Sequence, residues 1–279
     1  MKSDLIQRLV TGRYSTRVFD LLFNWGLDSS AMRLLHCRAR RKSRAFFKAN
    51  AQRVQRIVES LADETSKQAF AKAVLYRQTF RRRDAPPSER DPYFPRDLIS
   101  LTDHEVFVDC GAFVGDTVDS FLKHCGRFNR VVCFEPDPGN FAALSKAHPD
   151  PRIVKLPAGA WSEKTTLRFQ TGKGAGSAIA DQTADHALAI PVVALDEVEA
   201  CQGATFIKMD IEGAEMEALR GARGLIQRNR PKLAICIYHS DEDMLRIPEY
   251  LFATLDSYSF HVRHHSRNWQ ETVLYAIPL

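Results

Sequence analysis

Three carboxylates stand close together in the string Asp210-Ile211-Glu212-Gly213-Ala214-Glu215. They follow the apolar run 204–209 directly, so Asp210 ends a strand that should be buried. A buried, ionised carboxylate persists only with a partner such as a cationic ligand, a metal ion or hydrogen-bond donors. Glu212 and Glu215 share a face if a helix begins there, and their charge also suits the N-terminus of a helix. We predict that Asp210 and Glu212 belong to a catalytic site that handles positive charge.

His239 follows the next apolar run along the chain, residues 231–238. An imidazole with a pKa of about 6.5 can accept a hydroxyl proton at cellular pH. We predict His239 as the general base of the site, although a structural histidine is equally compatible with this position. Metal ligation together with Asp210 or Glu212 is a third option, but nothing in the spacing requires it, and we predict no metal.

A loop with two glycines follows the apolar run 105–109 and reads Asp109-Cys110-Gly111-Ala112-Phe113-Val114-Gly115-Asp116-Thr117. Glycines permit a tight turn and a close backbone approach to a ligand before a helix begins. Glu135 ends the next run, 130–135, twenty residues after Gly115. That is the distance at which nucleotide-binding units place a carboxylate that accepts both ribose hydroxyls. The loop and the acid together predict a ligand that contains adenosine.

The spacing of the glycines argues against a dinucleotide. Gly111 and Gly115 form G-x-x-x-G, whereas dinucleotide binders use G-x-G-x-x-G to rest a pyrophosphate on the helix. Phe113 and Asp116 are poor neighbours for a pyrophosphate, but an acidic residue suits a cation. S-adenosylmethionine, a nucleoside with a sulfonium cation, therefore fits better than NAD. Alternatively, the two glycines serve only to let the helix pack on the strand.

Small residues follow the run 152–156, in the order Ala158-Gly159-Ala160-Trp161. They can admit an adenine ring, on which Trp161 would stack, but a core tryptophan is equally compatible with the sequence. Near the C-terminus, polar and aromatic residues cluster between 261 and 271, and they either contact an acceptor or form a solvated edge.

After residue 105, short runs of β-branched and aromatic residues alternate with helical stretches. This pattern predicts βαβ units that build a parallel sheet, with strands at 105–109, 130–135, 152–156, 204–209 and 231–238. Ligands bind beyond the carboxyl ends of such strands, where all the acids above and His239 fall. Residues 165–169 and 190–193 predict an extra strand pair around a glycine-rich loop, and 258–265 with 272–277 predict a closing hairpin.

The first hundred residues differ from the rest. Residues 5–80 show apolar positions at helical spacing, and a charged, proline-rich connector follows at 81–95. Residues 1–100 hold 21 Lys and Arg against 10 Asp and Glu, whereas the remainder holds 18 against 24. We predict a helical N-terminal region at 1–98 and a second domain at 99–279. Six basic residues between Arg38 and Lys48 either contact an acidic polymer, lipid headgroups or nucleic acid, or form a solvated helix face.

The composition excludes several protein classes. With 279 residues, 44% of them hydrophobic and 26% charged, the chain is globular and not disordered. Its six cysteines form neither a dense disulfide pattern nor a C-x-x-C pair, so we expect reduced thiols. The apolar stretch at 18–25 is interrupted by Asp20 and Asn24, which disfavours a signal segment or a spanning helix. We expect a cytoplasmic protein.

Together these motifs resemble the FkbM family of S-adenosylmethionine-dependent methyltransferases. The matching segments are EVFVDCGAFVGDT at 105–117, FEPDPGN at 134–140, FIKMDIEGAE at 206–215, PKLAICIYH at 231–239 and ETVLYA at 271–276. The most specific of them is the D-x-E-G-x-E string. Many family members have Asn where this chain has Phe113.

The resemblance implies a class I methyltransferase fold. This is an α/β, Rossmann-like fold with a seven-stranded, mostly parallel sheet and a C-terminal antiparallel hairpin, here preceded by the N-terminal helical region. It also implies cofactor contacts along the matching segments. The loop on the methionine side of the cofactor would comprise Asp109, Gly111, Ala112, Phe113, Gly115, Asp116 and Thr117. The ribose would be bound by Glu135, the ribose clamp, with Pro136 and Asn140 beside it. The adenine would lie against Gly159, Ala160 and Trp161, and Asp210 would form the floor under the reacting centre.

The expected activity is therefore methylation of a hydroxyl oxygen on a sugar, a glycan or a related natural product, with proximity and alignment as the main source of rate. One alternative is an RNA methyltransferase that uses the basic N-terminal region, although nucleic acid is not the expected partner. Another is a nucleoside-binding module without a reaction, and peripheral membrane contact through the basic region stays open.

Overall fold

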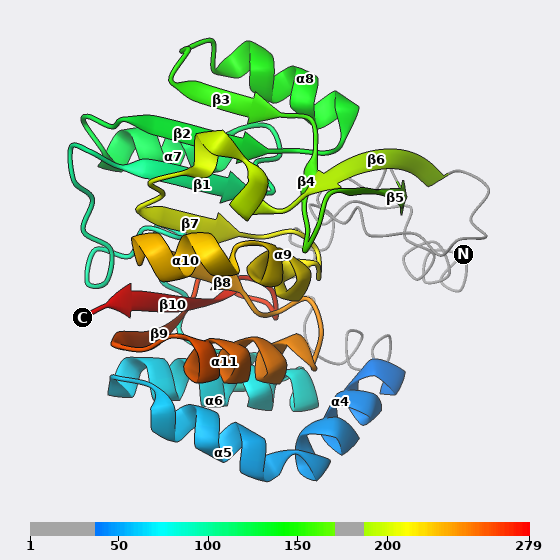
Figure 1. Ribbon diagram of the computed structural model, residues 1–279. Coiled ribbons are helices and arrows are strands. Elements are labelled where there is room, and N and C mark those ends of the chain that lie inside the picture. Colours follow the sequence, from blue (N-terminus) through cyan, green and yellow to red (C-terminus); the bar gives the residue numbers. More distant parts are fainter. Residues whose placement is uncertain (1–36, 171–186) are drawn as a thin grey trace.

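A computed structural model describes residues 37–170 and 187–279 and contains a central seven-stranded sheet (Figure 1). The strand order is β3-β2-β1-β7-β8-β10-β9. The first five of these strands are parallel, and β10 and β9 are antiparallel. Their bounds are β1 Val106–Cys110, β2 Arg130–Phe134, β3 Ile153–Leu156, β7 Phe206–Met209, β8 Lys232–Cys236, β9 Tyr258–His264 and β10 Thr272–Pro278. The predicted fold class, including the antiparallel C-terminal hairpin, is confirmed.

Helices cover both faces of this sheet. In Figure 1, α9, α10 and α11 lie in front of it, whereas α7 lies behind. The helices after residue 100 are α7 Asp116–His124, α8 Pro138–Ala147, α9 Glu215–Gly221, α10 Arg223–Asn229 and α11 Asp243–Thr254. Short 3-10 turns are η3 Leu195–Glu197 and η4 Glu199–Cys201. Because both faces are covered, the parallel strands read as continuous apolar runs and not as alternating ones.

Two hydrophobic clusters lie on the two faces. In β1, Val108 and Cys110 join one cluster, which includes residues of α9, α10 and α11. Phe107 joins the other, where it stacks on Phe121 of α7 at a ring-centroid distance of 4.9 Å. The connector before β1 belongs to this second cluster, since Phe94 is buried against Phe107 and Phe206. The proline-rich connector is thus part of the core.

A second, three-stranded sheet stands beside the main one in the order β4-β6-β5. Its strands are β4 Gly159–Ala160, β5 Thr165–Gln170 and β6 Ala187–Val193. The predicted strand pair is therefore present as β5 and β6, and the very short β4 was missed because two residues carry no pattern. The glycine-rich loop at 172–176 lies outside the described residues.

The N-terminal helices pack below the edge strand β9 in Figure 1. They are α4 Cys37–Ala49, α5 Ala51–Ser60 and α6 Glu64–Thr79, followed by the 3-10 turn η1 Arg82–Asp84. The hydroxyl of Ser66 in α6 accepts a hydrogen bond from the backbone N–H of Val262 in β9. A helix thus supplies a partner for a backbone group on the outer edge of the sheet. Arg53 of α5 forms a bidentate pair with Glu249 of α11, at 2.8 and 2.7 Å.

These helices share a hydrophobic cluster with the sheet, because Phe47, Ile57 and Phe70 belong to the cluster that contains Val108. The division of the chain into a helical region at 1–98 and a second domain at 99–279 stays a prediction. The basic segment forms α4, where most of the basic side chains are exposed and Phe47 is buried. Contact of this segment with a membrane or an acidic polymer also stays a prediction.

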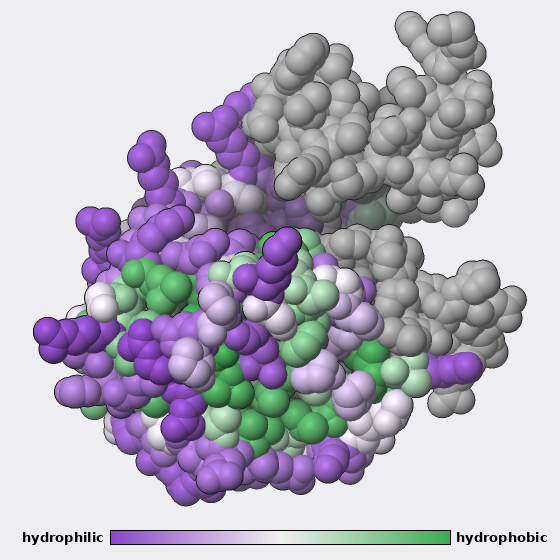
Figure 2. Space-filling view, turned by 90° about the horizontal axis from the view of Figure 1, so that it is seen from above, coloured by the Kyte–Doolittle hydropathy of each residue, from purple (hydrophilic) through white to green (hydrophobic). Residues whose placement is uncertain are grey.

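The surface seen from above, which is the side of α8 and β3, is shown in Figure 2. Hydrophilic residues surround hydrophobic ones that gather towards the middle of this view. Within the residues that the structure describes, no helix combines the length and the apolar character needed to cross a bilayer.

Candidate active site

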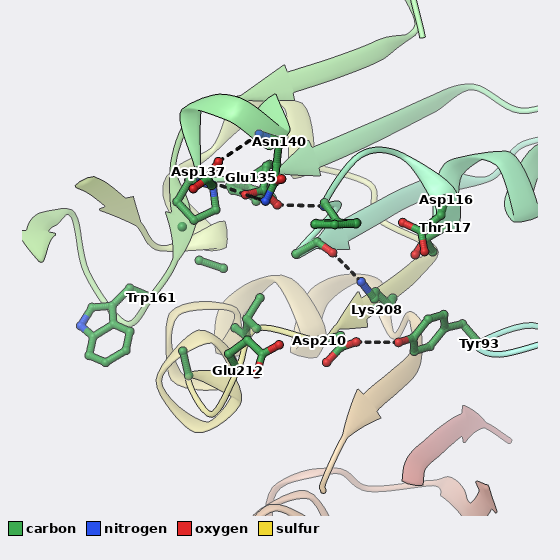
Figure 3. Close-up of a pocket in the computed structure, with 18 of the residues that line it drawn as sticks. Tyr93, Asp116, Thr117, Glu135, Asp137, Asn140, Trp161, Lys208, Asp210 and Glu212 are labelled. Carbon is green, nitrogen blue, oxygen red and sulfur yellow. Dashed lines mark hydrogen bonds between the residues drawn. The ribbon is translucent and has the colours of Figure 1, made fainter. Parts of the chain in front are cut away.

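A cavity of about 600 Å³ opens at the carboxyl ends of β1, β2, β7 and β8 (Figure 3). This is the place where open α/β sheets bind ligands, and the volume suits a nucleoside with room for a second molecule. Figure 3 shows Glu135, Asp137 and Asn140 at one end of the cavity, Asp210 and Tyr93 at the other, and Lys208 between them.

The loop after β1 forms one wall through its backbone. Gly111 has a φ of 83°, and a Cβ at this position would lie 2.0 Å from the carbonyl oxygen of Asp210. Only glycine therefore allows the loop after β1 and the loop after β7 to touch here. Gly115 has a φ of 99° and serves as the N-cap of α7, where a Cβ would collide with His148. Gly115 thus acts in packing behind the cavity wall.

Glu135 follows β2 and ties two loops together. One carboxylate oxygen accepts the backbone N–H of Phe113 at 2.8 Å, and the other accepts that of Asp137 at 2.9 Å. Asn140 donates a longer bond of 3.4 Å to the second oxygen. Burial raises the pKa of Glu135 above its ordinary value. Glu135 lines the cavity, and the oxygen that accepts from Phe113 has this single donor, so it can accept a further hydroxyl donor.

Lys208 is a buried cation at the centre of the site. It sits on β7 opposite Asp109 of β1, and its Nζ lies 2.9 Å from the carboxylate of Asp109. The same Nζ donates to the carbonyl oxygen of Gly111 at 2.8 Å. Burial opposes its charge, but the carboxylates of Asp109 and Asp210 outweigh burial and raise the pKa of Lys208. Asp109 is therefore a partner of Lys208 beneath the loop and does not line the cavity.

Asp210 receives two phenolic hydroxyls. Tyr93, from the connector before β1, donates to its Oδ2 at 2.8 Å, and Tyr238, two residues after β8, donates to its Oδ1 at 3.0 Å. Burial opposes the charge of Asp210, but His239, Lys208 and Tyr93 outweigh burial and lower its pKa. Asp210 is thus an ionised carboxylate that faces the cavity, as expected for a strand end that handles positive charge.

His239 lies behind Asp210 and is not among the residues that line the cavity. Its Nε2 lies 3.3 Å from Asp210 and 3.6 Å from Glu212, and its Nδ1 lies 3.1 Å from Glu215. Burial disfavours the charged imidazole, but Asp210 and Glu215 outweigh burial and raise the pKa of His239 to about 11. At neutral pH the ring carries its proton, so this arrangement argues against the expected role as a general base.

Two other carboxyl groups on the cavity wall have a pKa close to neutrality. Burial raises the pKa of Glu212 to about 7, and burial with the nearby charge of Asp210 raises that of Glu271 to about 7. Glu271 precedes β10 and lies 3.5 Å from the hydroxyl of Tyr238. Groups with such a pKa can exchange protons at cellular pH.

Four non-glycine residues on the cavity wall adopt the left-handed backbone conformation. They have φ values of 50° to 69° and are Tyr93, Phe113, Glu212 and Glu271. Such conformations cost free energy and persist only where the surrounding structure enforces them, which is common at functional sites.

Most of the expected site residues come together in the cavity. Those that line it are Gly111, Phe113, Asp116, Thr117, Glu135, Pro136, Asn140, Gly159, Ala160, Trp161, Asp210 and Glu212. Four expected residues lie outside the lining: Asp109, Ala112, Gly115 and His239. The assignment of each residue to the cofactor or to catalysis stays a prediction.

Sequence reasoning missed Tyr93, Lys208 and Tyr238 as parts of the cavity wall. Tyr93 stands in an irregular connector, and the other two stand inside apolar runs, so no local pattern marks them. A lysine within a buried strand was the available signal, because such a charge needs a partner.

The C-terminal cluster has mostly structural partners. His261 pairs with Asp63, and Arg263 pairs with Asp97 at 2.6 Å. Of the described residues 261–271, Gln270 and Glu271 line the cavity.

The cavity wall is strongly acidic. Its described residues include six carboxylates and one lysine: Asp116, Glu135, Asp137, Asp210, Glu212, Glu271 and Lys208. Since Lys208 is neutralised by Asp109, the cavity attracts cations and repels phosphate groups.

Comparison with known proteins identifies the relatives of this chain. Residues 109–262 match the methyltransferase FkbM domain. A solved methyltransferase FkbM from Methylobacillus flagellatus KT is 30% identical, with a TM-score of 0.72 over 84% of this chain. The chain spans 60% of the length of that protein.

Other solved structures are more distant. An rRNA methylase from Streptococcus thermophilus is 14% identical, with a TM-score of 0.42 over 64% of this chain and 89% of its own. A fibrillarin from Aeropyrum pernix, in complex with natively bound S-adenosyl-L-methionine, is 14% identical, with a TM-score of 0.41 over 65% of this chain and 71% of its own. No curated protein matches the chain.

Proposed function

Because the chain belongs to the FkbM methyltransferase family, we propose that it transfers a methyl group from S-adenosylmethionine to a hydroxyl oxygen of a sugar, a glycan or a related natural product. The observation that carries this proposal is the charge of the cavity. Six carboxylates against one neutralised lysine suit a ligand with a sulfonium and an ammonium group. They do not suit the pyrophosphate of a dinucleotide.

The residues present fit this cofactor. Glu135 would accept the ribose hydroxyls, with Asn140 giving up its longer hydrogen bond of 3.4 Å where a second hydroxyl is accepted, and the N–H groups of Phe113 and Asp137 fix the orientation of the carboxylate. Gly159, Ala160 and Trp161 form a wall of small and aromatic residues suited to adenine. Gly111 lets the backbone approach closely on the methionine side. The bound cofactor would supply an electrophilic methyl group.

The chain itself supplies alignment and charge. Asp210 stays ionised beside Lys208 and holds the hydroxyls of Tyr93 and Tyr238 in fixed directions. A rigid acidic floor of this kind stabilises a nearby cation and orients the acceptor, and such alignment accounts for much of the rate of a two-substrate reaction.

We assign the uptake of the hydroxyl proton to Glu271 in preference to His239. Glu271 lines the cavity, and its pKa of about 7 suits proton exchange at cellular pH. His239 is already protonated and lies behind Asp210. Methyl transfer to oxygen forms a C–O bond and breaks the S–CH₃ bond, and the proton that leaves the hydroxyl would pass to the Glu271 carboxylate.

The charge of the cavity also bears on the acceptor. A neutral hydroxyl compound enters an acidic cavity more easily than an RNA strand or a sugar phosphate does. The RNA alternative therefore finds no support at the site itself, and the neutral acceptor is favoured.

The first test is calorimetric titration of the purified protein with S-adenosylmethionine, S-adenosylhomocysteine and NAD. We expect binding of the first two with a dissociation constant of about 100 μM or tighter, and no binding of NAD. Binding of NAD alone would refute the cofactor assignment.

The second test measures S-adenosylhomocysteine formation with a panel of neutral sugars, sugar nucleotides, polyketides and RNA. We expect turnover with a neutral hydroxyl acceptor. Turnover on RNA, with binding that weakens as salt rises, would favour the RNA alternative. Cofactor binding without turnover on any acceptor would favour a module without a reaction.

A further inference from the structure

A second group of donor atoms lies beneath the cavity floor, where the loops after β7 and β8 meet. Asp210 follows β7, Glu215 begins α9, and His239 lies three residues after the end of β8. The donor atoms that these three side chains offer all lie within 4.8 Å of one another. Ligand atoms at 2.0–2.2 Å from one metal ion lie up to about 4.4 Å apart, so only small shifts separate this arrangement from a coordination shell.

Several polar atoms of this group are buried and have no hydrogen-bond partner. They are both ring nitrogens of His239 and the Oε2 of Glu215. The side chain of Glu215 is fully buried, and that of His239 is 8% exposed. Buried polar atoms are rarely left without a partner, so each needs an explanation.

The directions of approach matter as much as the distances. Carboxylate oxygens lie 3.1 Å from Nδ1 and 3.3 Å from Nε2 of His239, close enough for hydrogen bonds. Neither nitrogen has a hydrogen-bond partner, so these oxygens lie beside the N–H directions and not along them. Only one ring nitrogen can bind a given metal ion, and beside that nitrogen a carboxylate oxygen that lies off the N–H axis stands where a second ligand of the ion would lie.

We propose that Asp210, Glu215 and His239 form a binding site for a divalent transition-metal ion such as Mn²⁺ or Zn²⁺. One imidazole with two carboxylates is a ligand set for such ions, whereas Mg²⁺ and Ca²⁺ prefer oxygen alone. Glu212, whose Oε2 lies 3.6 Å from Nε2 of His239, adds a further carboxylate on the cavity side.

The metal ion would coordinate Oε2 of Glu215 and one ring nitrogen of His239, and it would displace the proton that this ring carries in the metal-free protein. The other ring nitrogen would keep its N–H, and the ion would offset the local negative charge. Because Asp210 and Glu212 line the cavity, the ion would lie next to the bound ligands. This inference goes beyond the expectation from the sequence, which required no metal. It also stands independently of the proposed function, since the site would bind its ion whatever reaction the cavity supports.

The test uses the full chain after removal of adventitious metals with a chelator. Calorimetric titration with Zn²⁺ and electron paramagnetic resonance with Mn²⁺ should show one saturable site with a dissociation constant of about 10 μM or tighter. Glu215→Gln should weaken binding by at least about tenfold, as expected when one ligand is lost. Glu217→Gln removes a carboxylate from the same helix as Glu215, where it pairs with Arg220, and serves as the matched control, which should bind as the parent does.

A spectroscopic measurement keeps the test valid if Glu215→Gln fails to fold. Electron spin-echo spectra of the parent protein with Mn²⁺ should show coupling to an imidazole nitrogen, and His239→Gln should abolish it. Absence of saturable binding up to about 1 mM, or equal binding by Glu215→Gln and the parent, would overturn the proposal. Mg²⁺ that displaces Mn²⁺ at equal concentration would overturn the assignment to a transition metal.

Discussion

The hydroxyl of Tyr93 lies 2.8 Å from the Oδ2 of Asp210, although 117 positions separate the two residues. Tyr93 stands before the region that matches the methyltransferase FkbM domain, which begins at residue 109. Its ring is buried, and Nζ of Lys208 lies 5.1 Å from the ring centroid. The connector before β1 is therefore part of the site and not only a link between two regions.

Tyr93→Phe should lower turnover by about tenfold and leave the affinity for S-adenosylmethionine nearly unchanged. The variant removes one hydrogen bond to a charged group, which is worth about 1.5–3 kcal/mol, and it frees Asp210 to rotate. Steady-state kinetics with the identified acceptor measures the effect. Tyr258→Phe, which loses a hydrogen bond to Pro231 far from the cavity, is the control. Equal kinetics of both variants would contradict the role of Tyr93.

Glu135→Ala should weaken the binding of S-adenosylmethionine by about 10–100-fold. The variant removes the acceptor for the ribose hydroxyls and also releases the N–H groups of Phe113 and Asp137. Calorimetric titration gives the affinities. Asp150→Ala removes an exposed carboxylate that pairs with Arg152, and its affinity should match that of the parent. An unaltered affinity in Glu135→Ala would exclude the ribose clamp.

Glu271→Gln should reduce turnover by about 10²-fold or more if this carboxylate accepts the proton. In the parent, the pKa of about 7 places the acidic limb of the rate profile near pH 7, since the carboxylate must be ionised to act. Turnover of the parent should thus increase with pH through this range, whereas the residual turnover of Glu271→Gln should not change with pH there. A profile that is the same in both proteins would remove Glu271 from the mechanism.

Lys208→Met should lower the free energy of unfolding by about 3–5 kcal/mol, because it leaves the fully buried Asp109 without its cation. The double variant Asp109→Asn with Lys208→Met should recover part of this loss. Urea unfolding monitored by circular dichroism measures each value. Lys67→Met breaks the exposed pair with Glu64 and should change stability very little. Equal effects of the two single Lys variants would contradict the buried pair as a source of stability.

Acidification should destabilise the protein between about pH 6.5 and pH 4. Burial lowers the pKa of His264 to about 4, so in this range the unfolded chain binds a proton that the folded chain does not. The loss amounts to about 3 kcal/mol and is complete below the folded pKa. The neutral ring is held by Thr272 and by the carbonyl of Asn268, at 2.9 Å each.

Urea unfolding at a series of pH values measures this dependence. His264→Asn should reduce the slope between pH 6.5 and 4 without abolishing it, because burial also lowers the pKa of His265 to about 4. His104→Gln, at an exposed position, should keep the slope of the parent. A slope that is unchanged in His264→Asn would assign the acid sensitivity to other groups.

Much of the fold could be predicted from the sequence, because buried parallel strands leave a strong local pattern. The runs at 105–109, 130–135 and 204–209 lie within two residues of β1, β2 and β7 at each end. The β4 strand has only two residues, and the pairing of α6 with β9 depends on contacts between distant segments, so neither leaves such a pattern.

The sequence by itself determined the strands, and with them the edge where Glu135, Asp210 and His239 collect, because side chains that follow parallel strands must meet at one end of a sheet. Only the tertiary structure decided what each group does there. Lys208 forms an ion pair with Asp109, and three carboxylates lie around the ring of His239. Tyr93, from the connector before β1, donates a hydrogen bond to Asp210. The physical reason is that protonation and hydrogen bonding depend on neighbours in space, and those neighbours lie up to 117 positions away in the chain.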